Sequence, residues 1–428
     1  MATPKDHAQA ILARILEGGG VEDMAARLRP RPPEHEPLPP RMPSGRDYTA
    51  ESLARRRQIL KEQGRSTACL SGACQDPAPE DLEGNMENFV GFARIPVGVL
   101  GPLRVNGLHA SGDFYVPLAT TEGALLASYH RGARLLSRAG GVTALCLTES
   151  VSRAPCFVFA NVREAGLFLS WALPKVEELQ AVVATTSSHC RLLDVRTTMS
   201  GREVFMGFEY STGDAAGQNM VTLATEAVCG FLLDGAPVKP MTWYLEGNMS
   251  GDKKATMLSF TSTRGRQVVA EALIPGELVE RYLHVTPLAL MRYWQVSIVG
   301  GIQSGSIGVQ GHYANALAAL FIACGQDAAC VSEASIGLTR FDVTDAGELY
   351  AAVSLPNLIV GTVGGGTWLP TARECLEMMD CYGTGKARKF AEICAATAMA
   401  GELSLTAAMA SGDFGRAHAE LGRKRKPS

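Results

Sequence analysis

Charged residues are sparse in this chain, and three of them are adjacent in one stretch of small residues. Asp, Glu, Lys and Arg make up 19% of the 428 residues, yet Asp252, Lys253 and Lys254 follow one another within EGNMSGDKKATM. An ammonium group in a site that excludes water can stabilise negative charge that develops on a carbonyl oxygen. Lys253 is therefore a candidate for that chemistry.

Two carboxylates and one histidine could act with this lysine. Asp327 follows an apolar run in FIACGQDAAC, so its carboxylate is expected to be partly buried and to need a cation, for which Lys253 is the candidate. Glu122 in ATTEGALLAS is expected at a helix start, and His418 lies in the tail SGDFGRAHAELGRKRKPS. Taken singly, each has an ordinary explanation as a helix-dipole partner, a solvated turn, a helix cap or a tail residue.

The surrounding sequence predicts the elements that carry such groups. Pro117 to Gly141 is predicted to form one helix that Thr120 or Thr121 caps. In STGDAAGQNM a strand is predicted to turn into a helix near Asp214, where free backbone N–H groups could meet a pyrophosphate. Val360 to Trp368 is a second glycine-rich loop that a ligand could approach closely. No G-x-G-x-x-G occurs, so a Rossmann site is not expected.

Composition and charge exclude several classes of protein. The formal charge is -3 and Lys and Arg are spread along the chain, so neither nucleic acid nor a membrane surface is an expected partner. The chain start lacks the order of a secretory signal, so the eleven cysteines are expected to stay reduced in a cytoplasm. The spacings from Cys69 to Cys74 and from Cys324 to Cys330 do not fit a zinc site, and no metal is expected.

The chain changes in texture along its length. Asp6 to Leu16 and Thr49 to Gln63 are predicted helices, and the proline-rich stretch from Arg27 to Gly45 is predicted to be an extended linker. From Glu87 onward, strands and helices alternate. Ile393 to Met409 is the most apolar helical stretch, and because it is alanine-rich and short for a bilayer, it is predicted to be a buried helix.

Seven motifs, in order, make the chain resemble the 3-hydroxy-3-methylglutaryl-CoA reductase family, in the class I type found in eukaryotes and some prokaryotes. Over about Glu87 to His418 they are ENFVGFARIPVGVLGPL, ATTEGALLAS, GDAAGQNM, GDKKA, GHYANALAALFIACGQDAA, GTVGGGT and MAGELSLTAAMASG. The resemblance implies an enzyme that reduces a thioester to an alcohol with two hydrides, through a thiohemiacetal and an aldehyde.

The same resemblance implies a role for each of the four candidate residues. Lys253 would stabilise the oxyanion at both reductions, and Asp327 would hold and tune that lysine. Glu122 would be the proton donor, which needs a raised pKa. His418 would protonate the departing CoA thiolate, and its place on a tail suits a group that closes over bound substrate.

Further site residues follow from the resemblance, together with the ligands that they would bind. The substrate would be an acyl-CoA thioester, and the cofactor NADPH, with NADH as an alternative. The residues implied are Ser128, Arg131 and His312 towards CoA, Asn315 in the Lys253 network, and Asp214, Gly217, Asn219, Val363 and Gly364 towards the nicotinamide dinucleotide.

The implied architecture is an α+β fold. Residues 1–84 would form a small helical and proline-rich N-terminal segment, and residues 85–159 with 245–428 a large domain around a long central helix. Residues 160–244 would be an inserted, ferredoxin-like domain for the dinucleotide. Active sites would form between the subunits of a homodimer, often paired into a tetramer.

Two positions depart from the family pattern at the acyl group. Val158 stands where the family usually has an arginine that holds the terminal carboxylate, and Glu246 stands where it has a serine. A carboxylate beside a carboxylate costs binding energy unless it is protonated or paired, for instance with Lys254. Either the acyl group differs and is neutral or cationic at its far end, or the contacts are locally realigned, with Arg153 or Lys254 replacing the lost one.

Two further departures lie on the cofactor side. Family members that use NADPH have an arginine for the 2′-phosphate at about Ser188, where His189 or Arg191 could substitute, and NADH use is the alternative. The middle of GDAAGQNM, Ala215 to Gln218, replaces the commoner Ala-Met-Gly-Met, which is expected to change packing more than charge.

The leading hypothesis is therefore reduction of 3-hydroxy-3-methylglutaryl-CoA to mevalonate and free CoA in isoprenoid biosynthesis. Val158 and Glu246 motivate a second one, a related enzyme that reduces another acyl-CoA or a carrier-bound thioester in specialised metabolism. A mevalonate oxidase that runs in reverse with NAD is a third. A non-catalytic thioester sensor or scaffold would tolerate loss of Lys253 or His418, and this chain keeps both.

Overall fold

The computed structural model describes residues 4–16, 19–43 and 47–412. The helices are α1 Pro4–Ile15, α2 Val21–Arg27, α3 Ala50–Glu62, α4 Leu125–Arg138, α5 Val162–Ala172, α6 Val176–Thr186, α7 Gln218–Gly235, α8 Gly276–Leu283, α9 Pro287–Ser304, α10 Tyr313–Ala323, α11 Val331–Ala334, α12 Pro370–Met378 and α13 Ala387–Ala410. The strands are β1 Val97–Gly107, β2 Ser111–Ala119, β3 Val142–Arg153, β4 Cys156–Val158, β5 Arg191–Ser200, β6 Glu203–Ser211, β7 Thr242–Tyr244, β8 Gly265–Ile274, β9 Leu338–Val343 and β10 Leu349–Leu358.

The long strand β3 joins two parts of one sheet. Its first half pairs parallel with β1 and antiparallel with β8, and the sheet continues through β10 to β9. Its last residues, from Val151 to Arg153, pair with β6, which also pairs with β4 and β5. Because all of these pairs except β1 with β3 are antiparallel, the molecule is a mixed α/β protein whose sheet differs from the parallel sheet of a Rossmann fold.

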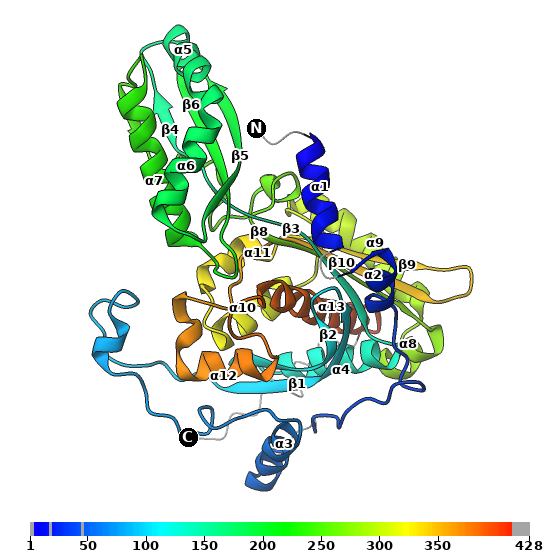
Figure 1. The fold of residues 1–428 in the computed structure, drawn as a ribbon. Helices are drawn as coiled ribbons and strands as arrows, with labels where there is room; N and C mark the ends of the chain where they lie inside the picture. Colours follow the sequence, from blue (N-terminus) through cyan, green and yellow to red (C-terminus); the bar gives the residue numbers. More distant parts are fainter. Residues whose placement is uncertain (1–3, 17–18, 44–46, 413–428) are drawn as a thin grey trace.

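Helix α13 lies in the main hydrophobic core. Ile393, Leu403 and most of its other residues are buried, as predicted for this stretch. Among the described residues it is the one helix long and apolar enough to cross a membrane, and 83% of its most apolar window is buried inside the molecule. Figure 1 shows α13 in the middle of the larger part of the molecule, and it packs against β10, α4 and α10. The helix is therefore packed as the centre of a protein core.

Small residues allow α4 to lie against α13. A Cβ atom at Gly132 would come within 1.8 Å of the Ala400 carbonyl oxygen, and one at Gly401 within 2.4 Å of the Tyr129 ring. The two backbones therefore approach more closely than larger side chains would permit. This contact fixes the position of α4, which carries several of the candidate site residues.

A second hydrophobic cluster forms a separate lobe. Figure 1 shows α5, α6, α7 and the strands β4 to β6 projecting from the rest of the molecule, with β3 leading into them. Its core contains Phe157, Phe159, Phe168 and Phe208, all fully buried. Phe157 and Phe159 precede residue 160, where the inserted domain is expected to start.

The N-terminal segment contains the predicted helices and one further helix, α2. Thr49 caps α3 with its side chain, which accepts the Ser52 N–H. The prolines after α2 are not a free linker, because the fully buried guanidinium of Arg104 on β1 donates hydrogen bonds to the carbonyls of Arg31 and Glu36. The prediction of an extended stretch is only partly right, because residues 33–36 form a turn and hydrogen bonds tie the segment to β1.

The expectation that all cysteines are reduced is wrong in this structure. Cys69 and Cys74 form a disulfide across a tight turn, whereas the nine other cysteines are free and buried. The N–H groups of Cys69 and Leu70 donate to the buried carboxylate of Glu374, which shapes the turn and brings the two thiols together. The spacing of this pair does not fit a zinc site, but the turn brings the two Cα atoms to 4.6 Å, a distance that a disulfide can span.

Candidate active site

The ammonium of Lys253 and the carboxylate of Asp327 form an ion pair. The Lys253 Nζ atom lies 2.8 Å from Asp327 Oδ2, and the two side chains are 43% and 39% exposed. This hydrogen bond raises the pKa of Lys253. Partial burial alone would raise the pKa of Asp327, but the hydrogen bonds from Lys253 and from the Ala329 N–H hold it below its usual value. The lysine is thus kept charged while its side chain stays partly exposed.

Two different elements supply this pair. Lys253 belongs to the Lys253 loop, residues 245–256, between β7 and the short helical turn Met257–Phe260. Asp327 follows α10 and caps the turn Ala328–Cys330, where its Oδ1 atom accepts the Ala329 N–H at 3.0 Å. Asp327 therefore does both things expected of it. One carboxylate oxygen caps the turn, and the other pairs with Lys253.

Glu122 and Asn315 line a common cavity of about 190 Å³, together with Thr120 and Thr121. Among the residues that the structure describes, no hydrogen bond joins Asn315 to Lys253, so the expected support of the lysine by this side chain is not present in this state. Glu122 is exposed, and its N–H donates to Thr120 Oγ1 at 3.0 Å.

The predicted start of the helix after Glu122 is wrong by several residues. Helix α4 begins at Leu125, its N-cap is Ala124 in a left-handed conformation (φ 71°), and no side chain caps it. Thr120 and Thr121 therefore precede a left-handed turn and do not cap the helix. Glu122 lies before the helix start, on the chain that leads into it.

Ser128 and Arg131 on α4 are held by one serine of α13. Ser128 Oγ lies 2.9 Å from Ser404 Oγ, and Arg131 donates from Nε to Ser404 Oγ at 3.0 Å and from Nη2 to the Ser404 carbonyl at 2.6 Å. Ser404 is fully buried. The core helix therefore fixes both side chains that are expected to face CoA.

His312, at the start of α10, is held by Glu402 of the same core helix. Glu402 accepts the N–H groups of Gly311 and His312 at 2.8 Å each and lies 3.2 Å from His312 Nδ1. Burial alone would raise the pKa of Glu402, but the hydrogen bonds from His312 and Gly311 lower it. The ring also stacks on Tyr129, with centroids 5.5 Å apart. Glu402 and Ser404 of α13 thus anchor three side chains from other elements, Ser128, Arg131 and His312. We call these three residues the α13 wall.

The predicted cofactor residues Asp214, Gly217, Val363 and Gly364 lie together. Ala215 forms a bridge with Val363, and the Thr362 N–H donates to the Asp214 carbonyl at 2.9 Å. Gly217 has φ 78° and is the N-cap of α7. The glycine-rich loop therefore packs against the turn before α7, as their assignment to one ligand requires.

Asp214 has a structural task at this place. Its Oδ2 atom accepts the Gly385 N–H at 2.7 Å and its Oδ1 atom accepts the Ala387 N–H at 3.0 Å, so the carboxylate caps the start of α13. Asn219, in the first turn of α7, is exposed. Ser188 is exposed in the turn between α6 and β5, where its Oγ atom lies 3.1 Å from His189 Nδ1.

The residues expected at the acyl group are paired differently from the suggestion made from the sequence. Lys254 Nζ donates to the Asp252 carbonyl at 2.8 Å. Arg153 lies 3.9 Å from Glu246 and donates to Asp252 Oδ2 at 2.5 Å. Arg153, and not Lys254, is therefore the cation beside Glu246. Val158 lies in β4, between β6 and β7.

His418, the expected thiolate protonator, lies outside the described residues. Its assignment stays a prediction.

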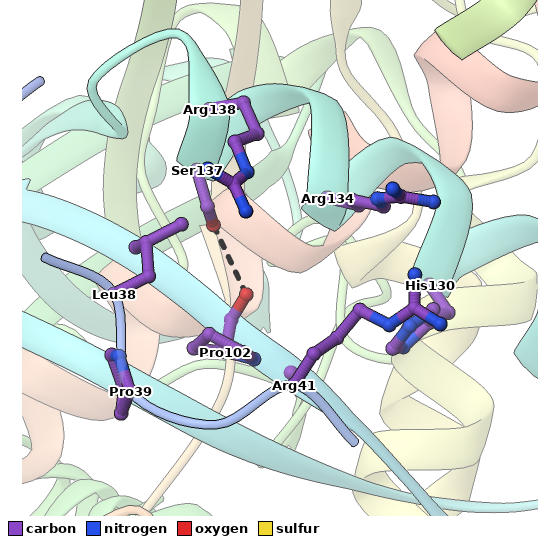
Figure 2. A pocket seen from close by; sticks show the side chains of 9 residues that line it. Leu38, Pro39, Arg41, Pro102, His130, Arg134, Ser137 and Arg138 are labelled. Carbon is purple, nitrogen blue, oxygen red and sulfur yellow. Dashed lines mark hydrogen bonds between the residues drawn. The ribbon is translucent and has the colours of Figure 1, made fainter. Parts of the chain in front are cut away.

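A cluster of basic residues was missed by sequence reasoning. Figure 2 shows Arg41, from the N-terminal segment, beside His130 and Arg134 of α4, with Arg138 one turn further on. They line a cavity of about 270 Å³. Burial, together with the charges of Arg41 and Arg134, lowers the pKa of His130 to about 4. The signal available in the sequence was the spacing of His130, Arg134 and Arg138, which places all three on one helix face.

Comparison with known proteins gives a consistent result. The family described as hydroxymethylglutaryl-coenzyme A reductase matches residues 52–423. The 3-hydroxy-3-methylglutaryl-coenzyme A reductase of Pyrococcus abyssi is 44% identical over 81% of this chain and 86% of that protein. The protein of this name from Methanocaldococcus jannaschii is 42% identical over 80% and 85%. The 3-hydroxy-3-methylglutaryl-coenzyme A reductase 1 of Dictyostelium discoideum is 34% identical over 87% and 67%.

Solved structures share the fold. The class II 3-hydroxy-3-methylglutaryl-CoA reductase from Streptococcus pneumoniae, bound to NADPH in open conformations, superposes with a TM-score of 0.68 over 83% of this chain and 96% of that one, at 18% identity. The family match and the relatives place the molecule among the oxidoreductases. The chain belongs to the hydroxymethylglutaryl-coenzyme A reductase family, so the resemblance read from the seven motifs is confirmed at family level.

Proposed function

We propose that this protein reduces 3-hydroxy-3-methylglutaryl-CoA to mevalonate and free CoA with two NAD(P)H, in the mevalonate pathway of isoprenoid biosynthesis. The observation that carries the proposal is the Lys253–Asp327 ion pair of 2.8 Å in a chain of this family. Lys253 presents a fixed positive charge to the carbonyl oxygen, and Asp327 keeps it protonated and in place. Glu122, which lines a cavity with Asn315, supplies the proton, and His418 protonates the departing thiolate.

For CoA we propose a path along α4. The α13 wall would hold the pantetheine end, because Ser128, Arg131 and His312 are fixed there by the core helix. The cavity of Arg41, Arg134 and Arg138 lies further along α4 and presents several positive charges with few acidic side chains in its lining. Guanidinium groups bind phosphate oxygens well, so this cavity suits the phosphates of CoA.

For the dinucleotide we propose the space between the start of α7 and the loop from Val363 to Gly365. The fit rests on the backbone: at Gly364 and Gly365 no atom lies within 4 Å of where a Cβ would be, so a ligand can approach the main chain there. When bound, the reduced nicotinamide supplies the hydride. We propose NADPH, with NADH as the alternative, since Ser188 offers no cation and His189 and Arg191 are its basic neighbours.

For the acyl group we propose the realigned contact. Arg153 stands between Glu246 and Asp252 and offsets the negative charge that Glu246 introduces. The relatives that are 42–44% identical over most of the chain are named for 3-hydroxy-3-methylglutaryl-CoA, so another acyl group is not favoured. Arg153 would take over the role of the arginine that Val158 replaces.

We further propose the class I type, with a long central helix and with residues 160–244, which follow β4, as an inserted ferredoxin-like cofactor domain. The class I assignment is supported by the seven motifs of the sequence, whereas the solved structure of similar fold is a class II protein at 18% identity. Self-association as a dimer or tetramer is supported by α9, where Val296, Val299 and Ile302 are exposed on one face. We propose a cytoplasmic location, which the nine buried free cysteines suit although Cys69 and Cys74 are paired.

One assay tests the proposed reaction. Purified protein is mixed with 3-hydroxy-3-methylglutaryl-CoA and either NADPH or NADH, and cofactor oxidation and free thiol are followed together. We expect two molecules of NAD(P)H to be oxidised for each free CoA thiol released, with mevalonate as the product. Turnover with other acyl-CoA thioesters but not with this one would instead establish the altered-substrate hypothesis. The double variant Val158→Arg with Glu246→Ser should leave that preference unchanged if Arg153 already holds the acyl carboxylate.

A further inference from the structure

The backbone of Lys253 has a conformation that needs an external hold. Its φ angle is 56°, in the left-handed region that residues with a Cβ seldom adopt. Such a conformation persists where surrounding contacts determine it, and it is common at sites where a side chain must point in one direction. The ion pair with Asp327 holds the end of the side chain, so the peptide must be held by other residues.

That hold is a buried carboxylate behind the loop. The Lys253 N–H donates to Glu333 Oε1 at 3.0 Å. Glu333, on α11, is fully buried, and burial raises its pKa despite its pairing with Arg264. Arg264 donates from Nη1 to Oε1 at 2.6 Å and to Oε2 at 2.7 Å. A buried charge without a partner costs free energy, so removing either Glu333 or Arg264 alone would destabilise this part of the molecule.

Arg264 also binds groups from two other parts of the chain. Its Nη2 atom lies 2.9 Å from Asp252 Oδ1, in the residue just before the lysine, and donates to Gln218 Oε1 at 2.6 Å. Gln218 is the first residue of α7, and its Nε2 atom lies 3.3 Å from Cys330 Sγ. One guanidinium that is 2% exposed therefore connects the Lys253 loop, α11 and the start of α7.

We propose that Glu333, Arg264 and Gln218 are positioning residues that hold the Lys253 peptide in its left-handed conformation, so that the ammonium is aimed at the reacting carbonyl. The proposal rests on the proposed function for the role of Lys253. Gln218 stands where the commoner motif Ala-Met-Gly-Met has its last methionine. A methionine has no amide oxygen that could accept a hydrogen bond from Arg264. The altered motif leaves the charge unchanged, in line with the expectation from sequence, and it adds a polar contact to Arg264.

The chain offers a matched control for the test. Glu374 on α12 is also a buried carboxylate, 4% exposed, that accepts main-chain N–H groups, from Cys69 and Leu70. Glu333→Gln and Glu374→Gln each replace one buried carboxylate that accepts main-chain N–H groups, but only the first touches the Lys253 loop. The conservative variant Gln218→Met leaves the Arg264–Glu333 pair intact, so it folds even if Glu333→Gln does not.

Two readouts separate positioning from general destabilisation. For Glu333→Gln we expect kcat to fall about tenfold or more, with KM for both substrates within about threefold, because a displaced group costs rate more than binding. Gln218→Met should lower kcat by about threefold. Glu374→Gln should lower only the melting temperature. If Glu333→Gln and Gln218→Met both keep the kcat of the wild type, the proposal is overturned.

The second readout does not depend on activity. A short pulse of acetic anhydride, followed by mass spectrometry, gives the modification of Lys253 relative to its neighbour Lys254 in the same peptide. Release of the loop should raise this ratio in Glu333→Gln and, less, in Gln218→Met, and should leave it unchanged in Glu374→Gln. A changed ratio in a protein that turns over no thioester would retain the positioning inference and reject the proposed function; an unchanged ratio in both variants would reject the inference.

Discussion

The α13 wall and the Lys253 loop are anchored in different ways. In the wall, Ser128, Arg131 and His312 each bond directly to a buried residue of the core helix. In the loop, the functional ammonium is 43% exposed, and the loop is fixed from behind through its backbone. The wall therefore presents rigid side chains for binding, whereas the loop presents one charge that must reach a reacting atom. We expect defects in the wall to affect binding and defects in the loop to affect rate.

The sharpest way to break this comparison is to remove the ammonium. Lys253→Met should lower kcat by about 10²–10³-fold or more, because one group that stabilises the developing oxyanion is lost. The affinity for CoA, measured by calorimetric titration, should stay within about threefold, because the wall is untouched. Lys61→Met, an exposed lysine on α3, is the control. Equal losses of rate and of CoA affinity would show that loop and wall are one unit.

The packing of the wall can be tested through stability. Gly132→Ala would bring a Cβ to 1.8 Å from the Ala400 carbonyl, so α4 must shift away from α13. We expect a loss of about 1–3 kcal/mol in the free energy of unfolding, measured with urea, and a weakened hold on Arg131. At Gly230, inside α7, a Cβ would meet nothing within 4 Å, so Gly230→Ala should be neutral or stabilising. A Gly132→Ala protein of full stability would mean that the close approach is not needed.

The same contrast explains what the sequence could predict. Lys253, Asp327 and the core helix lie in recognisable local sequence patterns. Their residue types and their neighbours in sequence were therefore enough to predict them. Arg264 and Glu333 did not stand out, because they lie 69 residues apart and only their contact gives them meaning. Arg264 follows TST before a strand and has the local pattern of a surface turn.

Local signals also failed where backbone geometry overrode them. Thr120 and Thr121 are good capping residues, but the left-handed turn at Ala124 starts α4 later. The disulfide of Cys69 and Cys74 depends on a turn that the distant Glu374 holds, which spacing alone does not show. The basic cavity needed Arg41 to be brought to α4 by a segment that was expected to be an extended linker.

The basic cavity should act on binding alone, with a moderate effect. Arg134→Gln together with Arg138→Gln removes two charges from the proposed CoA phosphate site. We expect KM for 3-hydroxy-3-methylglutaryl-CoA to rise about tenfold and its dependence on salt to weaken, with little change in kcat. Arg163→Gln, on α5 in the other lobe, should change neither. A fall in kcat at unchanged KM would place this cavity outside the CoA path.

The smallest effect concerns the tuning of the lysine. Asp327→Asn removes the carboxylate whose hydrogen bond and negative charge raise the pKa of Lys253, while the partial burial that lowers it remains. The pairing stabilises the folded protein fully below the ordinary pKa of a lysine, and this stability is lost as the pH rises through the raised pKa of Lys253. The variant should therefore lose its ammonium charge at a lower pH than the wild type. On the acid side the pair is lost as the pH falls through the lowered pKa of Asp327.

Acetylation of Lys253 measured across the alkaline range gives its titration directly. Because both side chains are more than a third exposed, solvent screens the pair and the shift should be small. A titration of Lys253 that is unchanged or displaced to higher pH would mean that Asp327 holds the lysine in place without tuning its charge.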